Sequence, residues 1–239
     1  MLKTFIPFAY GLAIVYLETT GKMPRYINPE AGRLNIGAAV FLFVLGLSAS
    51  RSGTTINTGI GGRIGYLILF LPVLLVLLFP AKEFGASLIP GKGIKVIGFS
   101  LKENTKTEAV LTPGRYGQPD ALSGGSDIVL DEKNFLSLTG EMELTPGSFI
   151  GRQVVMEGFA CYPIKTEPDL LVPARYVFNH CAADAGAVGL AVDLNGLPPP
   201  LQDTWVRVEG IITLRGESLL IQARSLKEKP KPENGYIYP

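Results

Sequence analysis

The stretch that decides the fold is residues 175–191, RYVFNHCAADAGAVGLA, in which a polar turn separates two apolar runs. Both runs have the composition of extended strands. The turn holds the only histidine of the chain, His180, one of its two cysteines, Cys181, and also Asp184. Because a polar connection between two strands places its side chains on a rigid frame, the sequence predicts a candidate functional site at this turn.

The side chains of His180, Cys181 and Asp184 all bind metal ions, and histidine with cysteine favours zinc, copper or iron over magnesium or calcium. Three such ligands suit a zinc ion with an open fourth position. Adjacent residues on a strand point to opposite faces, so His180 and Cys181 converge only if the backbone turns there. The small residues that follow allow such a turn. The sequence therefore predicts a candidate metal site.

Two other interpretations of the turn stay open. In the first, Cys181 is a small buried side chain, Asp184 caps a short helix, and His180 forms a hydrogen bond with a backbone carbonyl. In the second, Cys181 is a reactive thiolate, which a neighbouring imidazolium would favour. Arg175 is another candidate, because a guanidinium in an apolar strand needs a partner, either Asp184 or Glu157. An exposed edge position for Arg175 is the alternative.

Five apolar runs predict five strands, at residues 153–161, 170–179, 188–194, 205–214 and 218–223. Two of them contain an interior glycine, Gly158 and Gly210, which is typical of the bulges and bends of a small barrel. We therefore expect residues 150–228 to form an all-β, OB-like five-stranded barrel. The Pro-rich tail, residues 229–239, ends in two tyrosines that we expect to pack on this domain or on a partner.

Three uncharged apolar segments occupy the first 81 residues, at about residues 4–17, 34–50 and 64–81. A bilayer core of about 30 Å needs about 20 helical residues, and about 17 at the least. The second and third segments are long enough, whereas the first is shorter and contains Pro7. A signal-like or interfacial helix is the alternative for the first segment. We expect residues 1–81 to be a membrane α-helical part with three transmembrane helices.

Residues 82–149 lie between these two parts and are rich in Gly, Pro, Ser and Thr. This composition predicts a stalk or linker with short elements. A short strand is expected at residues 96–101, and Asp131 is expected to begin a short helix that ends at Leu138.

Charge is distributed unevenly along a chain that is 18% charged overall. Residues 1–90 carry 7 Lys and Arg against 3 Asp and Glu, and residues 91–239 carry 15 against 18. The acidic balance of the second part argues against nucleic-acid binding, which needs a basic surface. Basic residues near the helix ends favour a cytoplasmic C-terminal domain, but long domains cross membranes regardless of charge, so the orientation stays open.

Motifs for catalysis are absent from the sequence. It contains no Gly-rich phosphate loop, no Ser-His-Asp set and no paired carboxylates. With a single histidine, we predict no catalytic and no cofactor-binding residues, and therefore no enzyme. Two cysteines are too few for a disulfide scaffold, and whether Cys161 and Cys181 pair stays open.

Several blocks of the sequence together resemble the YcgQ-like family of bacterial membrane proteins. These blocks are Tyr26-Ile27-Asn28, residues 149–152 leading into Gly158-Phe159, residues 175–189 with the pattern His-Cys-x-x-Asp, residues 205–210, and the tyrosine-rich end. The resemblance covers nearly the whole chain. It implies a membrane-anchored OB-like domain that works beside a YcgR-like permease or another membrane protein, with a link to zinc or another metal ion.

The resemblance also implies a function and a location. It implies a multi-pass accessory subunit in the lipid bilayer of the cell membrane, whose OB-like domain gates, delivers or senses a solute such as zinc. It favours an extracytoplasmic C-terminal domain. Some family members carry a His-rich run between the second and third helices, but residues 51–59 contain no His or Cys, and Cys161 has no counterpart in the family pattern. The alternative is a non-catalytic interaction module that holds a membrane assembly together.

Overall fold

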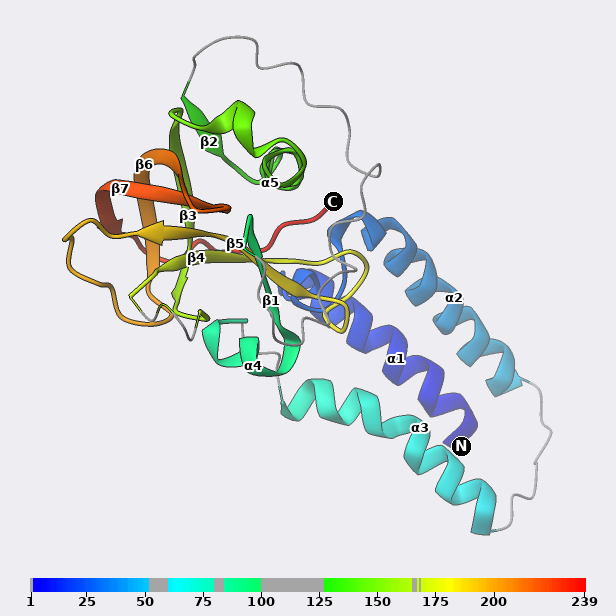
Figure 1. Ribbon diagram of the computed structural model, residues 1–239. Coiled ribbons are helices and arrows are strands. Elements are labelled where there is room, and N and C mark those ends of the chain that lie inside the picture. The colour runs from blue at the N-terminus through cyan, green and yellow to red at the C-terminus, as the bar shows by residue number, and fades with distance from the viewer. Residues whose placement is uncertain (1, 52–59, 80–83, 100–126, 165–166, 168) are drawn as a thin grey trace. The chain divides into compact units, whose positions relative to one another are not determined.

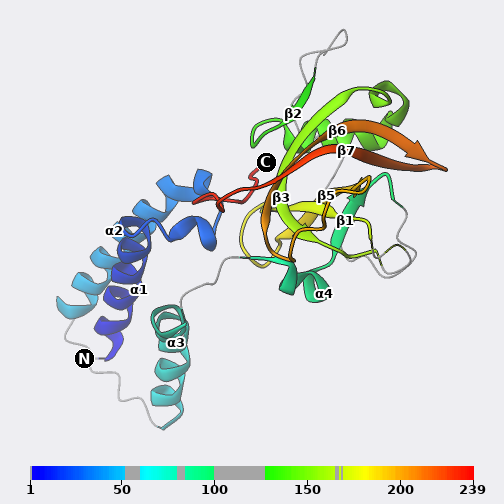
Figure 2. The ribbon, with the colours of Figure 1, turned by 90° about the vertical axis from the view of Figure 1, so that its left-hand side faces the viewer.

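A computed structural model describes residues 2–51, 60–79, 84–99, 127–164, 167 and 169–239. The chain divides into two compact units, Met1–Glu83 and Phe84–Pro239. The first is helical, and the second is built mainly from strands (Figures 1 and 2).

Three helices form the first unit: α1 (Leu2–Thr19), α2 (Gly32–Arg51) and α3 (Ile60–Leu78). Helix α1 packs against α2 because two glycines admit aromatic rings. A Cβ atom at Gly11 would lie 3.2 Å from the Phe43 ring, and one at Gly46 would lie 2.8 Å from the Phe8 ring. Helix α1 also contacts α3, where the Tyr10 hydroxyl donates a hydrogen bond of 2.6 Å to the carbonyl of Leu69.

The expectation of three transmembrane helices is supported for one of them. Among the described residues, only α2 is long and apolar enough to cross a membrane by itself, over Leu34–Arg51 with a mean hydropathy of 1.6. The apolar parts of the other two helices, Phe5–Thr19 and Ile64–Leu78, are shorter.

The second unit contains a closed five-stranded barrel, as the sequence predicted. Its strands are β3 (Gln153–Cys161), β4 (Val172–Val177), β5 (Gly186–Asp193), β6 (Trp205–Arg215) and β7 (Ser218–Glu228). Neighbouring strands follow the order β3-β4-β5-β7-β6, and β6 pairs with β3 to close the barrel. All pairs are antiparallel except β5 with β7. This order, with one parallel pair, is the arrangement of an OB fold.

The interior glycines have the roles that the sequence predicted for them. At Gly210 the register between β6 and β7 shifts, which marks a bulge or irregularity, and a Cβ atom there would lie 2.3 Å from the carbonyl oxygen of Gln222. At Gly158 strand β3 passes so close to β4 that a Cβ atom would lie 2.7 Å from the Ala174 oxygen. Glycine therefore permits the sharp bends that close a small barrel.

The described part of the expected stalk packs as part of the barrel unit. It supplies the 3-10 turn η3 (Ala86–Leu88), helices α4 (Ile89–Lys92) and α5 (Phe135–Leu144), and strands β1 (Ile94–Ile97) and β2 (Ile128–Leu130). Strand β1 pairs in parallel with β5, and β2 pairs in parallel with β3. The expected helix after Asp131 begins at Phe135 and continues beyond Leu138, because Asp131 first accepts two backbone hydrogen bonds in a turn.

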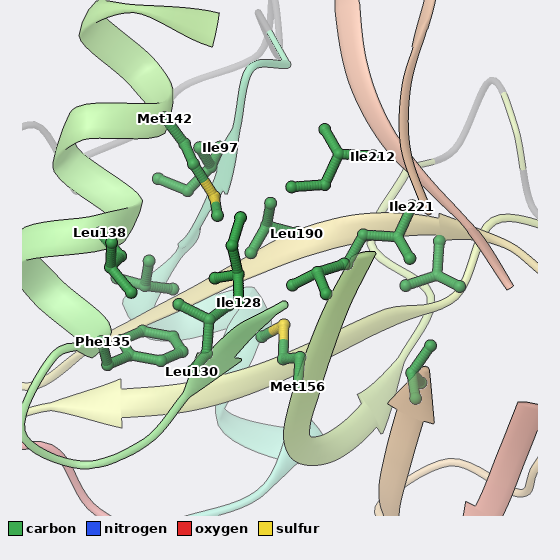
Figure 3. Packing of buried hydrophobic residues seen from close by; sticks show 14 of the residues in the cluster. Ile97, Ile128, Leu130, Phe135, Leu138, Met142, Met156, Leu190, Ile212 and Ile221 are labelled. Atoms are coloured by element: carbon green, nitrogen blue, oxygen red, sulfur yellow. The ribbon is translucent and has the colours of Figure 1, made fainter. Parts of the chain in front are cut away.

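The core of the barrel is filled partly by these added elements. Figure 3 shows side chains from β1, β2 and α5 meeting those of the barrel strands, with Ile97, Ile128, Leu130, Phe135, Leu138 and Met142 directed towards Met156, Leu190, Ile212 and Ile221. Phe135, Met142 and Met156 are completely buried. Burial of this apolar surface is what joins the described part of residues 84–149 to the barrel.

A second apolar cluster lies on the other face of β3, β4 and β5. It includes Phe159, Cys161, Val172, Tyr176, Phe178, Ala187, Ala191 and Tyr236. Residues from η3 and the C-terminal tail cover it, and Ala86 and Tyr236 are both buried. The tail therefore packs on the domain, which is one of the two positions expected for its tyrosines.

Candidate functional site

The turn between β4 and β5 is held together by the carboxylate of Asp184. One oxygen of this carboxylate accepts a hydrogen bond of 2.9 Å from the backbone N–H of His180, and the other accepts one of 3.3 Å from the N–H of Cys181. The His180 ring nitrogen Nδ1 lies 3.2 Å from the same carboxylate, and the Asp184 N–H bonds back to the Cys181 carbonyl. Asp184 thus closes the turn through local side-chain-to-backbone bonds, and no helix begins there, so the expected cap of a short helix is not what the structure shows.

The carbonyl end of the same turn is bound by Lys92 from α4. Its ammonium group donates hydrogen bonds of 2.8 Å to the Ala182 oxygen and 3.2 Å to the Ala183 oxygen. The ammonium also lies 5.3 Å from the centre of the Phe84 ring, in a cation–π position. A carboxylate and an ammonium therefore bind the two polar ends of the His-Cys-x-x-Asp turn.

The donor set of the turn does not fit a zinc ion as it is arranged. Both Asp184 oxygens accept hydrogen bonds from backbone amides, and the His180 side chain is 76% exposed. Within the described part of the chain, no group of three or more His, Cys, Asp and Glu side chains could hold a metal ion. The zinc role of His180, Cys181 and Asp184 therefore stays a prediction.

The two cysteines are free thiols. Cys161 is buried in β3, where its Sγ donates a hydrogen bond of 3.0 Å to the Val172 carbonyl. Burial raises the pKa of Cys161 well above its usual value, with a smaller contribution from Asp203, so this thiol stays protonated. Cys181 is half-buried at the turn.

Arg175 is buried, so the alternative of an exposed edge position is wrong, and the guanidinium has partners, which differ from those that the sequence suggested. The guanidinium donates 3.2 Å hydrogen bonds to Glu132 and to the Gly235 carbonyl, and it lies 5.5 Å from the centre of the Trp205 ring. Burial lowers the pKa of Arg175, and Glu132 opposes that shift. Arg175 therefore connects β4 to the segment before α5 and to the C-terminal tail.

Glu157 instead takes part in an ion-pair group on the barrel surface. Its carboxylate lies 3.0 Å from the Arg207 guanidinium and 2.7 Å from the Lys229 ammonium. Burial alone would raise the pKa of Glu157, but the hydrogen bonds from Lys229 and Arg207 outweigh it, so the pKa is lowered. This group fixes the first residue of the tail to β3.

An aromatic cluster around Phe84 was not predicted from the sequence. The Phe84 ring lies 5.2 Å from Tyr176, 5.4 Å from Phe178 and 5.9 Å from Tyr236, and the Phe178 and Tyr236 rings stack at 4.5 Å. The only sequence signal for this cluster was the pair of aromatic residues at the end of the tail. The position of Phe84 follows from a contact between the two ends of the second unit, which no local pattern shows.

The aromatic cluster lies on the barrel face on which OB folds bind their ligands. OB folds bind oligonucleotides and oligosaccharides on the face of their second and third strands, which here are β4 and β5. The chain covers part of that face with Phe84 and Tyr236, and Tyr176, Phe178 and Trp205 are buried. Stacking of nucleic-acid bases needs exposed aromatic rings in a basic groove.

The sequence matches two models of one protein family. The DUF1980 N-terminal domain matches residues 2–95, and the DUF1980 C-terminal domain matches residues 117–239. The chain belongs to the DUF1980 family. The C-terminal match contains the His-Cys-x-x-Asp turn, Arg175 and the tail, so the arrangement described above lies within a DUF1980 C-terminal domain.

Two relatives give the family a biological context. A Streptococcus mutans protein named "Putative two-component membrane permease complex subunit" is 23% identical over 273 aligned positions, which cover 100% of this chain and 99% of the relative. A Bacillus subtilis protein named "UPF0703 protein YcgQ" is 21% identical over 192 positions, which cover 72% of this chain and 67% of the relative. The resemblance to the YcgQ-like family is thereby confirmed.

Proposed function

We propose that this protein is a membrane-anchored accessory subunit of a permease complex. The observation that carries the proposal is the similarity over the full length to a relative named as a subunit of a two-component membrane permease complex. The names of the relatives indicate a permease subunit rather than an enzyme. In this proposal the helices anchor the subunit in the membrane beside the permease. The barrel regulates the permease or holds the complex together.

We propose further that α1 and α3 cross the membrane together with α2. Large apolar side chains are exposed along α3, among them Leu67, Ile68, Leu71 and Leu78, and along α2, among them Leu34, Phe41 and Val44. Exposed apolar surface of this extent is unusual in a soluble protein and indicates contact with lipid or protein. Pro7 and Pro72 lie inside helices, which membrane helices tolerate because neighbouring groups satisfy the freed carbonyls.

Co-purification from the native membrane tests the accessory role. We expect the tagged full chain, extracted in mild detergent, to retain a multi-helix membrane protein in constant ratio and to stay in the membrane pellet after washing at alkaline pH. An unrelated tagged protein with three membrane helices is the control. Recovery of the chain alone, or its release by the alkaline wash, would contradict the proposal.

A second candidate function is the interaction module without a ligand of its own. It is favoured by two observations: the chain covers part of the face on which OB folds bind ligands, and the polar ends of the His-Cys-x-x-Asp turn bond to the protein itself. The two candidates differ in whether the barrel binds a solute. Zinc is the solute to test, because the turn suggested it.

We expect calorimetric titration of the purified full chain with zinc to show no micromolar binding that depends on Cys181. The physical reason is that zinc would have to displace the backbone hydrogen bonds of Asp184. Cys181→Ser is the matched control, because it removes one potential ligand and leaves the carboxylate in place. Micromolar binding in the wild type that this substitution abolishes would support metal sensing or delivery instead.

A further inference from the structure

The loop between β5 and β6 carries three consecutive prolines followed by an exposed leucine (Figure 1). Residues 194–204 read LNGLPPPLQDT. The side chain of Leu201 is 80% exposed, more than any other large apolar side chain among the described residues, those of α2 and α3 included. Pro198 and Pro199 are exposed as well. Residues 198–201, which we call the proline strip, therefore present an apolar surface to their surroundings.

The sequence of the proline strip restricts its conformation. Each proline ring holds its own φ at about −65°, and each residue that precedes a proline is kept out of the helical region. Both constraints act on Pro198 and Pro199, so they favour the polyproline II conformation, which has three residues per turn. In this conformation Pro198 and Leu201 lie one turn apart, on the same face. A segment that is restricted in this way loses little conformational entropy when it binds a partner.

Hydrogen bonds hold the proline strip on the end of strand β3. The hydroxyl of Tyr162, the residue after β3, donates a hydrogen bond of 2.8 Å to the carbonyl of Pro200. The backbone N–H of Asp203 donates one of 2.9 Å to the Ala160 carbonyl, and the Ala160 N–H donates one of 2.8 Å to the Thr204 carbonyl. Pro200 is buried between these contacts. The strip is thus fixed on one side and exposed on the other.

The chain turns sharply where the loop begins and where it ends. Asn195 has a φ of 51° and Asp203 a φ of 69°, and no other non-glycine residue of the described chain has a positive φ. The Asp193 carboxylate accepts a hydrogen bond from the N–H of Asn195, and the Asp203 carboxylate accepts one from the N–H of Ala86. Such conformations cost free energy and are concentrated at functional sites. The fold therefore positions the proline strip at some cost to its stability.

The chemistry of the loop suits a protein groove better than a membrane surface. Residues 194–204 contain no Lys or Arg, and their one charged side chain, Asp203, is bound to the backbone of Ala86. Attachment to anionic lipids needs basic residues or a larger apolar face. A polyproline segment also has no internal hydrogen bonds, so its carbonyls would be unsatisfied in hydrocarbon. Grooves lined by aromatic side chains are the sites that bind such segments in proteins.

We propose that the proline strip binds a groove lined by Trp and Tyr side chains on the part of the partner subunit that lies outside the membrane. The proposal rests on the accessory role, which supplies the second subunit. Pro198 and Leu201 pack between the aromatic rings. The indole N–H and phenol O–H groups of the groove donate hydrogen bonds to the carbonyls of Pro198 and Pro199. The strip is thus the element of the barrel that contacts the permease.

A photoreactive benzophenone amino acid in place of Leu201 tests this contact in the full chain in native membranes. We expect a cross-link to the multi-helix membrane protein that co-purifies with the wild-type chain. Mass spectrometry should place the attachment in a segment that contains Trp or Tyr and lies outside the membrane helices of that protein. The same amino acid in place of Leu144 is the matched control, because Leu144 is 69% exposed and lies at the end of α5. We expect no cross-link from this position.

The substitution Leu201→Gln gives a second readout. We expect it to lower the amount of partner retained per chain by at least about tenfold, as for a central residue of an interface. Because the side chain is exposed, the thermal unfolding of the barrel, followed by Trp205 fluorescence, should stay unchanged. Leu144→Gln should retain the partner in full.

The two proposals can fail separately. If the wild-type chain keeps its partner while position 201 reacts no more than position 144, the docking role of the proline strip is wrong and the accessory role stands. Attachment of position 201 to a lipid, to a second copy of this chain or to a protein that does not co-purify also contradicts the docking role. A wild-type chain that retains no partner and forms no cross-link overturns both proposals.

Discussion

The substitution Phe135→Ala is expected to destabilise the C-terminal unit by about 3–5 kcal/mol. Phe135 begins α5, is completely buried, and lies beside Leu130 and Met156 in the barrel core (Figure 3). Truncation leaves a cavity that these neighbours fill only partly. For a unit of this size the thermal transition should fall by roughly 10 °C. Trp205 is the only tryptophan of the chain, so its fluorescence reports the unfolding of this unit.

Leu144→Ala, at the other end of α5, is the matched control. Its side chain is 69% exposed, so removal should change stability by less than about 0.5 kcal/mol. If Phe135→Ala were as mild as this control, α5 would not be part of the barrel core. The described part of residues 82–149 would then form a separate stalk after all.

The five barrel strands could be predicted because each carries its own evidence. Strands β3 and β6 alternate buried and less buried residues along much of their length, and an alternating pattern needs no knowledge of the partner strand. By contrast, β2 has three residues, which is too short for a pattern. The burial of Ile128 and Leu130 depends on pairing with β3, which follows more than twenty residues later in the sequence.

The candidate site likewise contains local contacts, which the sequence could suggest, and contacts between distant residues, which it could not. The sequence offered Asp184 as the cap of a short helix, and the structure shows it closing a turn instead, through bonds that are local along the chain. Lys92 and Glu132 could not be predicted as partners, because they lie 90 and 43 residues from the groups that they bind. Glu157 looked suitable for Arg175, but β3 places it beside Arg207 and Lys229 instead.

The lengths of the apolar segments limit what hydropathy can show about membrane crossing by the helices of the first unit. A hydropathy argument needs about 17 residues or more, and among the described helices only α2 provides such a window. Both α1 and α3 contain a proline, Pro7 and Pro72, yet both expose large apolar side chains. Exposure of these side chains is therefore the observation behind the proposal that α1 and α3 also cross the membrane.

Gly158→Ala is expected to destabilise the barrel by about 3 kcal/mol, whereas Gly140→Ala should stabilise it by about 0.5–1 kcal/mol. A Cβ atom at Gly158 would lie 2.7 Å from the oxygen and 2.8 Å from the nitrogen of Ala174, and these backbone atoms cannot move without separating β3 from β4. At Gly140, within α5, an added Cβ atom would have no side chain and no backbone from outside the helix's own neighbouring turns within 4 Å, so alanine only restricts the unfolded chain. Thermal unfolding of the two variants, followed by Trp205 fluorescence, should thus give shifts of opposite sign. Equal shifts would mean that β3 and β4 do not approach closely, and that the barrel closes by another route.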